Sequence, residues 1–285
     1  MLLLRASMAL PNGLIIAPVW GNAEGSSKVS LDAIWCYYSI KISAARPAPL
    51  ITGEFLVKTL ILMCLVVLSG LVNAQPLEVK VLDDGGSGPY RAVATTEPSL
   101  RDYVVYRPQN LSVAAQAEGP LPLVVFANGG CNDTSFPFER MLSELASHGY
   151  VVIALGAMQQ SLDDRPLQKA GNNMITAALD WAREQAAAEL GDYYQMVDTG
   201  RIASAGQSCG GAQLLATASE PRFSTYLMFN SGIGDMHMAA ASRASLTNLH
   251  GPVIYLVGGD TGVATDNEKL DYQRIEHVPV VFLII

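Results

Sequence analysis

Short apolar runs alternate with amphipathic segments from residue 123 to the end of the chain. The apolar runs have the length and the branched side chains expected of buried strands. They cover residues 123–127, 150–155, 202–205, 223–229, 253–257 and 280–285. Repeated strand and helix units of this kind predict a mostly parallel central sheet flanked by helices, so the expected fold class is α/β.

Helices are predicted between these strands wherever apolar residues recur at a spacing of three or four. The first follows Pro137, a residue type that favours the first helical turn, and ends at Gly149. Its apolar positions are Phe138, Met141, Leu142, Leu145 and Ala146. Further helices are expected around residues 175–182, over residues 212–218 and over residues 266–275.

The two edges of the predicted sheet are expected to differ. Residues 77–82, 91–95 and 102–106 suit antiparallel strands at one edge of the sheet, with a turn at residues 83–86. At the other edge the chain stops on the last predicted strand. We therefore expect a sheet that is truncated after that strand.

The N-terminal segment is expected to lie outside this fold. An apolar run over residues 59–72 follows Lys58 and precedes a small-residue cleavage site at Ala74, which is typical of a signal peptide. As a helix this run would span about 21 Å, short of the roughly 30 Å of a bilayer core. We interpret residues 56–74 as a signal peptide or, alternatively, a signal anchor.

These boundaries predict domain organisation and location. Residues 1–55 are an atypical leader that is not part of the fold, and residues 75–285 form the folded domain. If the leader is cleaved, the protein is secreted and has no stable membrane association. In the alternative, it is tethered to a membrane through residues 56–74.

Composition narrows the classes of partner. Of the 285 residues, 50% are hydrophobic and 15% are charged, enough apolar content for a full core in one domain. The formal net charge of −8 and the lack of a basic cluster argue against nucleic acid. The chain has neither a His/Cys cluster with metal spacing nor the Lys-Ser/Thr of a phosphate loop, so no metal or cofactor is expected. The oligomeric state is left open.

A Gly-x-Ser-x-Gly motif, Gly206-Gln207-Ser208-Cys209-Gly210, follows the strand predicted at residues 202–205. Between a strand and a helix this pattern is typical of a nucleophile elbow, in which the serine occupies a tight, strained turn. The two glycines leave room for strand and helix to approach closely. We therefore expect Ser208 to be a catalytic nucleophile; the alternative is a glycine-rich turn between two core elements.

A serine nucleophile needs hydrogen-bond donors for the oxyanion that forms during acyl transfer. The loop that begins at Asn128 follows a predicted strand and is rich in glycine. Its backbone N–H groups can point into the site, and a further N–H follows the nucleophile directly. We expect the oxyanion hole to be formed by Gly129, Gly130, Cys131 and Cys209.

Only Cys131 and Cys209 remain when the N-terminal segment, with Cys36 and Cys64, is set aside. One lies in the turn after a predicted strand and the other follows the candidate nucleophile, so both are expected at the same edge of the sheet. The two can form one disulfide bond. Two small buried thiols are the alternative.

The acid and the base are less well defined than the nucleophile. Asp260 follows the strand at residues 253–257, where an orienting carboxylate belongs in the order serine, acid, histidine. Asp266 is the second candidate, and Asp260 could instead be a turn residue. A histidine is required after the last strand and the chain has none there. No histidine of the chain is well placed as the base: the four are His148, His237, His250 and His277.

Residues 121–285 resemble the α/β-hydrolase superfamily, and more narrowly the secreted fungal-type hydrolases of the chlorophyllase and polyester-hydrolase (cutinase-like) branch. The segments that carry the resemblance are Asn128-Gly129-Gly130-Cys131 and residues 146–154, 205–211, 229–232 and 278–280. The resemblance implies an α/β-hydrolase fold, Ser208 as nucleophile, an oxyanion hole in the loop 128–131, and a carboxylic ester, small or polymeric, as substrate.

This chain departs from that branch at two catalytic positions. Relatives read Gly-Gly-x-x-Asp-Ile-Ala after the strand that carries the acid, and here Gly262 stands in place of their aspartate. Relatives also continue past the last strand into a Gly-His-Gly-Gly segment that carries the catalytic histidine, and this chain ends before it. Two functions remain: a serine ester hydrolase, incomplete without its histidine, or a non-catalytic binding protein with the same fold.

Overall fold

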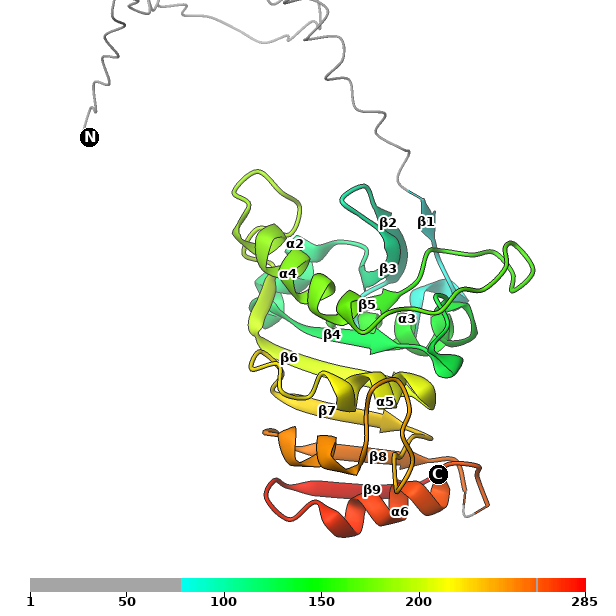
Figure 1. Ribbon diagram of the computed structural model, residues 1–285. Coiled ribbons are helices and arrows are strands. Elements are labelled where there is room, and N and C mark those ends of the chain that lie inside the picture. Colours follow the sequence, from blue (N-terminus) through cyan, green and yellow to red (C-terminus); the bar gives the residue numbers. More distant parts are fainter. Residues whose placement is uncertain (1–77, 260) are drawn as a thin grey trace, which may run out of the picture. The chain divides into compact units, whose positions relative to one another are not determined.

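The computed structural model describes residues 78–259 and 261–285, which are built around a nine-stranded sheet (Figure 1). The strands are β1 (Val79–Lys80), β2 (Ala92–Glu97), β3 (Leu100–Pro108), β4 (Leu121–Ala127), β5 (Val151–Leu155), β6 (Val197–Gln207), β7 (Thr225–Phe229), β8 (Val253–Val257) and β9 (Val280–Ile284). They lie in the order β1-β2-β3-β5-β4-β6-β7-β8-β9. Neighbours from β5 to β9 are parallel, and β1, β2, β3 and β5 pair antiparallel. The expected α/β fold with a mostly parallel sheet is confirmed.

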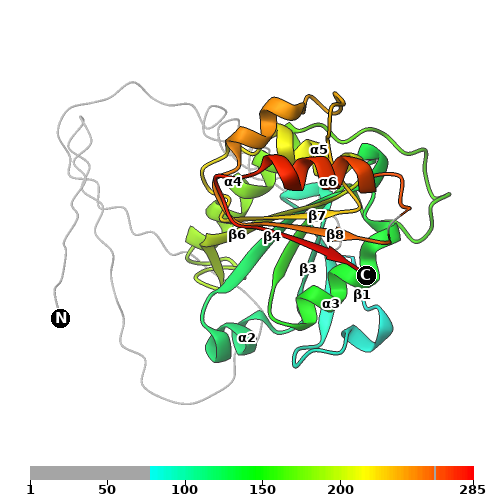
Figure 2. The ribbon, with the colours of Figure 1, turned by 90° about the horizontal axis from the view of Figure 1, so that it is seen from below.

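Helices cover both faces of this sheet (Figure 2). They are α2 (Leu111–Glu118), α3 (Glu139–Ser147), α4 (Asn173–Ala187), α5 (Cys209–Ala216) and α6 (Thr265–Arg274), with short 3-10 turns η1 (Asp83–Gly85), η2 (Gly129–Cys131), η3 (Phe136–Phe138) and η4 (Arg243–Asn248). α4, α5 and α6 lie on one face and α3 lies on the other. Along β4, Leu123 and Val125 belong to the apolar core on the face covered by α4 and α5. Val124 and Phe126 belong to a second apolar core on the opposite face, which α3 covers. A strand buried on both faces is apolar throughout, which is why the sequence shows a continuous run here.

The parallel register brings four loops to one edge of the sheet. Ala127 of β4 pairs with Gly206 of β6, Gln207 of β6 pairs with Phe229 of β7, and Phe229 pairs with Leu256 of β8. The loops after β4, β6, β7 and β8 therefore leave the sheet side by side. In open α/β sheets, ligands bind at this edge, outside the carboxyl ends of the strands.

One described helix, α2, has no counterpart among the predicted elements. It begins after Asn110, whose Oδ1 accepts the N–H of Val113 at 3.1 Å, and it ends before Gly119. Both residue types favour helix ends. Only Leu111 and Ala114 of its eight residues are buried, so the segment is too short and too exposed to show helical periodicity.

Two predicted bounds need correction. β6 begins at Val197 rather than residue 202, because Val197 pairs with Leu121 before a register shift in the ladder. The helix predicted from residue 212 begins at Cys209, directly after Ser208.

Several sequence predictions fall outside the described residues. They are the leader at residues 1–55, the signal peptide or anchor at residues 56–74, and the candidate acid Asp260. Within the described part of the chain, no helix combines the length and the apolar character needed to cross a bilayer.

Gly210 marks the closest approach of α5 to the end of β4. A Cβ at this position would lie 2.1 Å from the carbonyl oxygen of Ala127 and 2.9 Å from the nitrogen of Asn128, and both are backbone atoms. We expect Gly210→Ala to lower the free energy of unfolding by about 3 kcal/mol, measured by urea denaturation. Gly200→Ala is the control, since its methyl group would meet only the carboxylate of Asp198, at 3.2 Å. Equal losses in the two variants would contradict the prediction.

Candidate active site

Ser208 occupies the turn between β6 and α5 with φ 52° and ψ −120°. A positive φ in a residue other than glycine is strained. Four hydrogen bonds to its backbone hold it there. Its N–H donates to the carbonyl of Phe229 at 3.1 Å. Its carbonyl accepts the N–H of Gly211 at 3.0 Å, the N–H of Ala212 at 3.4 Å and the hydroxyl of Ser231 at 2.7 Å. The side chain is half-buried, and its Oγ makes no hydrogen bond to another described residue.

The turn is possible because the first and last residues of the motif are glycines. A Cβ on Gly206 would lie 2.6 Å from the carbonyl carbon of Gly210. Strand β6 and helix α5 therefore cross so closely that no side chain would fit between them. The sequence motif and the backbone agree, and the chain presents Ser208 in the geometry of a nucleophile elbow.

The loop after β4 forms the turn η2, with Gly130 at φ 64° and Cys131 at φ 52°. The carbonyl of Asn128 accepts the N–H of Cys131 at 3.1 Å, and that of Gly129 accepts the N–H of Asn132 at 3.2 Å. In a planar trans peptide, a carbonyl and the N–H that follows it point in opposite directions. The N–H groups of Gly129 and Gly130 therefore point out of the turn.

The N–H of Cys209 is the matching donor on the other side. Cys209 is the first residue of α5, where an amide has no acceptor within its own helix. The preceding carbonyl, of Ser208, points into the helix, so this N–H points away from it. Of the four N–H groups expected from the sequence, those of Gly129, Gly130 and Cys209 have no acceptor among the described residues. The N–H of Cys131 is engaged within η2 and is removed from the set.

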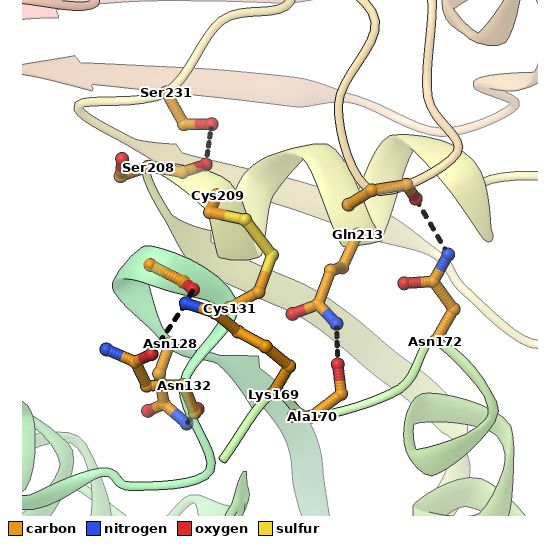
Figure 3. The surroundings of a disulfide bond; sticks show 12 residues. Asn128, Cys131, Asn132, Lys169, Ala170, Asn172, Ser208, Cys209, Gln213 and Ser231 are labelled. Carbon is orange, nitrogen blue, oxygen red and sulfur yellow. Dashed lines mark hydrogen bonds between the residues drawn. A yellow bond between two sulfur atoms is a disulfide. The ribbon is translucent and has the colours of Figure 1, made fainter. Parts of the chain in front are cut away.

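A disulfide bond joins Cys131 to Cys209, with their Cα atoms 5.1 Å apart (Figure 3). The sequence left this pairing open against two free thiols, and the disulfide is confirmed. The bond links the loop after β4 directly to the residue that follows Ser208. It closes a sequence separation of 78 residues.

The opposite side of the loop is held by the segment before α4. The Nζ of Lys169 donates to the carbonyl of Gly130 at 2.6 Å, and the N–H of Ala170 donates to the carbonyl of Cys131 at 2.8 Å. Gln213 of α5 in turn donates from Nε2 to the carbonyl of Ala170 at 2.7 Å. Figure 3 shows this second connection between the loop and α5 beside the disulfide.

The acid position is described only in part. Asp260 lies outside the described residues. At the end of β8, the N–H of Gly258 donates to Oδ1 of Asn230 at 2.6 Å. Asp266, the second candidate, is exposed in the first turn of α6. Gly262, which replaces the aspartate of the resembling branch, is also exposed.

Two buried carboxylates behind the elbow were missed by sequence reasoning. Glu268 and Asp271 of α6 are both fully buried. Glu268 accepts the N–H of Ser231, and Asp271 accepts the N–H groups of Ile233 and Gly234 at 2.6 and 2.9 Å. Their spacing of three on the helix predicted over residues 266–275 was the available signal, because it places both on one helical face.

This burial shifts the titration of both groups. Removal from water raises the pKa of Glu268 to about 6, the N–H of Ser231 opposes the shift, and the nearby Asp271 adds to it. Burial also raises the pKa of Asp271, against its two backbone donors and the guanidinium of Arg274. The hydroxyl of Tyr255 faces the pair, and burial raises its pKa well above the usual value.

No described histidine makes a hydrogen bond to Ser208. His148 contacts Glu144, His250 contacts the hydroxyl of Tyr226, and His277 contacts the carbonyl of Leu249. His237 lies exposed in the loop after β7 without a recorded hydrogen bond. In the same described residues, no group of three or more His, Cys, Asp or Glu side chains could hold a metal ion.

Part of the chain is similar to known proteins. Residues 115–229, which contain the η2 loop and the elbow, match a family model described as PETase, PET hydrolase-like. No curated protein sequence gave a match. The chain is similar to the solved structure of a proposed dienelactone hydrolase from Klebsiella pneumoniae (19% identity, TM-score 0.46, covering 73% of this chain and 85% of that one). It is also similar to a fungal esterase from Rhizomucor miehei (15% identity, TM-score 0.48, covering 84% and 83%).

Glu268 predicts a pH dependence of stability. Its pKa of about 6 in the folded state exceeds the ordinary glutamate value of 4.5, so the folded state binds more protons between those two pH values. Stability should therefore fall as pH rises from about 4.5 to 6, by about 2 kcal/mol. We expect Glu268→Gln, which keeps an acceptor for Ser231, to flatten this slope in urea unfolding curves recorded from pH 4 to 8. Asp266→Asn, an exposed carboxylate on the same helix, is the control. An unchanged slope in Glu268→Gln would contradict the assignment.

Proposed function

We propose that this chain is a member of the α/β-hydrolase superfamily and a serine hydrolase that cleaves carboxylic esters through an acyl-enzyme on Ser208. The observation that carries the proposal is the backbone of Ser208. Its positive φ places the half-buried side chain on a tight turn. The N–H groups of Gly129, Gly130 and Cys209, which have no acceptor among the described residues, lie on the two elements that meet beside it.

In the proposed reaction, Oγ of Ser208 attacks the ester carbonyl and transfers its proton to a base. The carbonyl oxygen becomes an oxyanion and accepts hydrogen bonds from the N–H groups of Gly129 or Gly130 and of Cys209. The alcohol then leaves with a proton, and an acyl group stays bonded to Ser208. Water attacks this acyl-enzyme, releases the acid and restores the serine.

The assignment of the remaining groups follows the order of the chain. We assign the acid to Asp260, since it follows β8 and the alternative Asp266 is exposed on α6. We assign the base to none of the four histidines. Three make hydrogen bonds to other groups, and His237 is exposed.

We extend the substrate class to bulky and polymeric esters. The loop between β7 and β8 spans residues 230–252 and contains only the short turn η4, so little chain is available there to cover the site. The name of the matched family, PET hydrolase-like, supports the same class. A film of poly(ethylene terephthalate) beside a soluble p-nitrophenyl ester tests this breadth.

A second function is favoured by one specific observation. No described histidine contacts Ser208, and a protein with this fold but no base would act as a binding protein for ester-like ligands. Such a protein would keep the tight turn at Ser208 and the backbone N–H donors beside it. Removing one member of a triad leaves catalysis only about 10³ to 10⁴-fold above the rate in water, too slow for an enzymatic role.

Export from the cell is part of the proposal. Disulfides persist in oxidising compartments, and the bond between Cys131 and Cys209 fits secretion. We expect protein recovered from culture medium to begin at Gln75, because cleavage after Ala74 removes the predicted signal peptide. N-terminal peptide mass spectrometry measures this. A secreted protein that begins before residue 55 would contradict the cleavage.

Substitution of Ser208 tests the hydrolase directly. We expect the protein to hydrolyse p-nitrophenyl esters and to gain one fluorophosphonate adduct on Ser208, seen by peptide mass spectrometry. Ser208→Ala should abolish the adduct and lower kcat/KM by about 10³-fold or more. Ser204→Ala is the matched control on the same strand, because its buried Oγ has no hydrogen-bond partner among the described atoms. Binding of an ester analogue without Ser208-dependent turnover would instead support the binding protein.

A further inference from the structure

The free donors of the candidate oxyanion hole belong to two separate elements. Gly129 and Gly130 are in the loop after β4, and Cys209 begins α5. An oxyanion needs both sets within hydrogen-bond reach at the same time. The distance between the two elements is therefore the quantity on which the hole depends.

Two connections fix this distance, and one of them is covalent. The disulfide joins Cys131, directly after the two glycines, to Cys209 itself (Figure 3). The second connection is noncovalent and runs through Ala170, which donates to the carbonyl of Cys131 and accepts from Gln213 of α5. One bonded sulfur atom belongs to Cys131, the residue next to the donor Gly130. The other belongs to Cys209, whose own N–H is a donor.

We propose that the Cys131–Cys209 disulfide is a positioning element of the oxyanion hole, which holds the amides of Gly129 and Gly130 at a fixed separation from the amide of Cys209. This inference rests on the proposed hydrolase function. It assigns to the bond a role in turnover that is separate from its role in stability.

The backbone of the loop explains why the bond is needed. Gly130 and Cys131 both have positive φ, and at Cys131, which carries a Cβ, this conformation is unfavourable outside a constrained turn. Without the disulfide, Cys131 can relax toward negative φ. That change rotates the adjoining peptides and moves the amides away from the oxyanion position.

The loss should fall on turnover rather than on substrate binding. The oxyanion exists in the transition state and the tetrahedral intermediate, whereas the ground-state carbonyl interacts weakly with the same donors. Removal of a single oxyanion donor costs about 10²- to 10³-fold in kcat. Displacement of donors that remain present should cost less, about 10- to 100-fold, with KM little changed.

Lys169 also holds the loop after β4, and its substitution gives a second test of the inference. Its exposed side chain donates to the carbonyl of Gly130 at 2.6 Å and to Oδ1 of Asn132 at 3.0 Å. Fixing that carbonyl fixes the orientation of the peptide between Gly130 and Cys131. Because the ammonium group is exposed, its loss should loosen the loop without the stability loss that accompanies removal of a disulfide.

The experiment compares the oxidised protein with Cys131→Ala, Cys209→Ala, the double variant, Lys169→Met and Lys169→Arg. Each is assayed below its own unfolding temperature, with the folded state checked by circular dichroism. We expect the single and double cysteine variants to share one reduced kcat, since the interaction is a single bond. Lys169→Met should show a smaller loss, and Lys169→Arg, which keeps a cationic donor, should restore most of it.

Affinity for an aryl boronic acid separates positioning from general destabilisation. Its tetrahedral serine adduct places an oxygen in the oxyanion hole, so its affinity should fall about as much as kcat in each variant, while KM stays within about twofold. Wild-type kcat and boronate affinity in the folded cysteine variants would overturn the inference. If the oxidised wild type shows no Ser208-dependent turnover, the proposed function fails.

Amide hydrogen exchange gives a readout that needs no turnover. Reduction of the wild type with a phosphine should speed exchange in peptides that cover residues 128–132, and reoxidation should reverse it. The double variant should exchange quickly whether or not reductant is present. Unchanged exchange on reduction, with both thiols shown to be alkylated, would overturn the inference independently of activity.

Discussion

The site depends on one close contact, the crossing of α5 over the ends of β4 and β6. A Cβ at Gly206 or Gly210 would overlap backbone atoms, so only this pair of glycines lets the helix begin where it does. That starting point forces Ser208 into a positive φ, at a cost of about 1–3 kcal/mol. The hydrogen bonds to its N–H and carbonyl, from three different elements, offset this cost. Moving α5 outward would displace the serine and the amide of Cys209 together.

The elbow is supported from behind by polar rather than apolar packing. The loop after β7 carries buried N–H groups that need acceptors, and α6 supplies them as the carboxylates of Glu268 and Asp271. Carboxylates accept such bonds strongly but resist burial, which is why their pKa values rise. The hydroxyl of Ser231 in turn donates a hydrogen bond to the carbonyl of Ser208. Helix α6 thus supports the loop after β7, and through Ser231 that loop contacts the turn at Ser208.

What the sequence predicted well is local or follows from burial. The buried strands are continuous apolar runs, and the turn at Ser208 follows from a pattern of five neighbouring residues. Two cysteines placed after neighbouring strands made the disulfide possible, but the sequence left it open against two free thiols. The contact of Lys169 with Gly130 and that of Glu268 with Ser231 join residues 39 and 37 positions apart, so no local pattern reveals them. The engaged N–H of Cys131 depends on the turn type of η2, which a pair of glycines does not determine.

Backbone donors and proton-transfer groups make different demands on a fold. The N–H donors of Gly129, Gly130 and Cys209 are fixed by a turn, a helix start and a disulfide. In the proposed hydrolase they would stabilise an oxyanion whatever group removes the proton from Ser208. A base must instead be brought to Oγ by a side chain from a loop. The same arrangement of backbone donors would therefore serve a hydrolase or a binding protein for tetrahedral and ester-like ligands. The two functions differ in proton transfer alone, because the parts that recognise the reacting carbonyl are common to both.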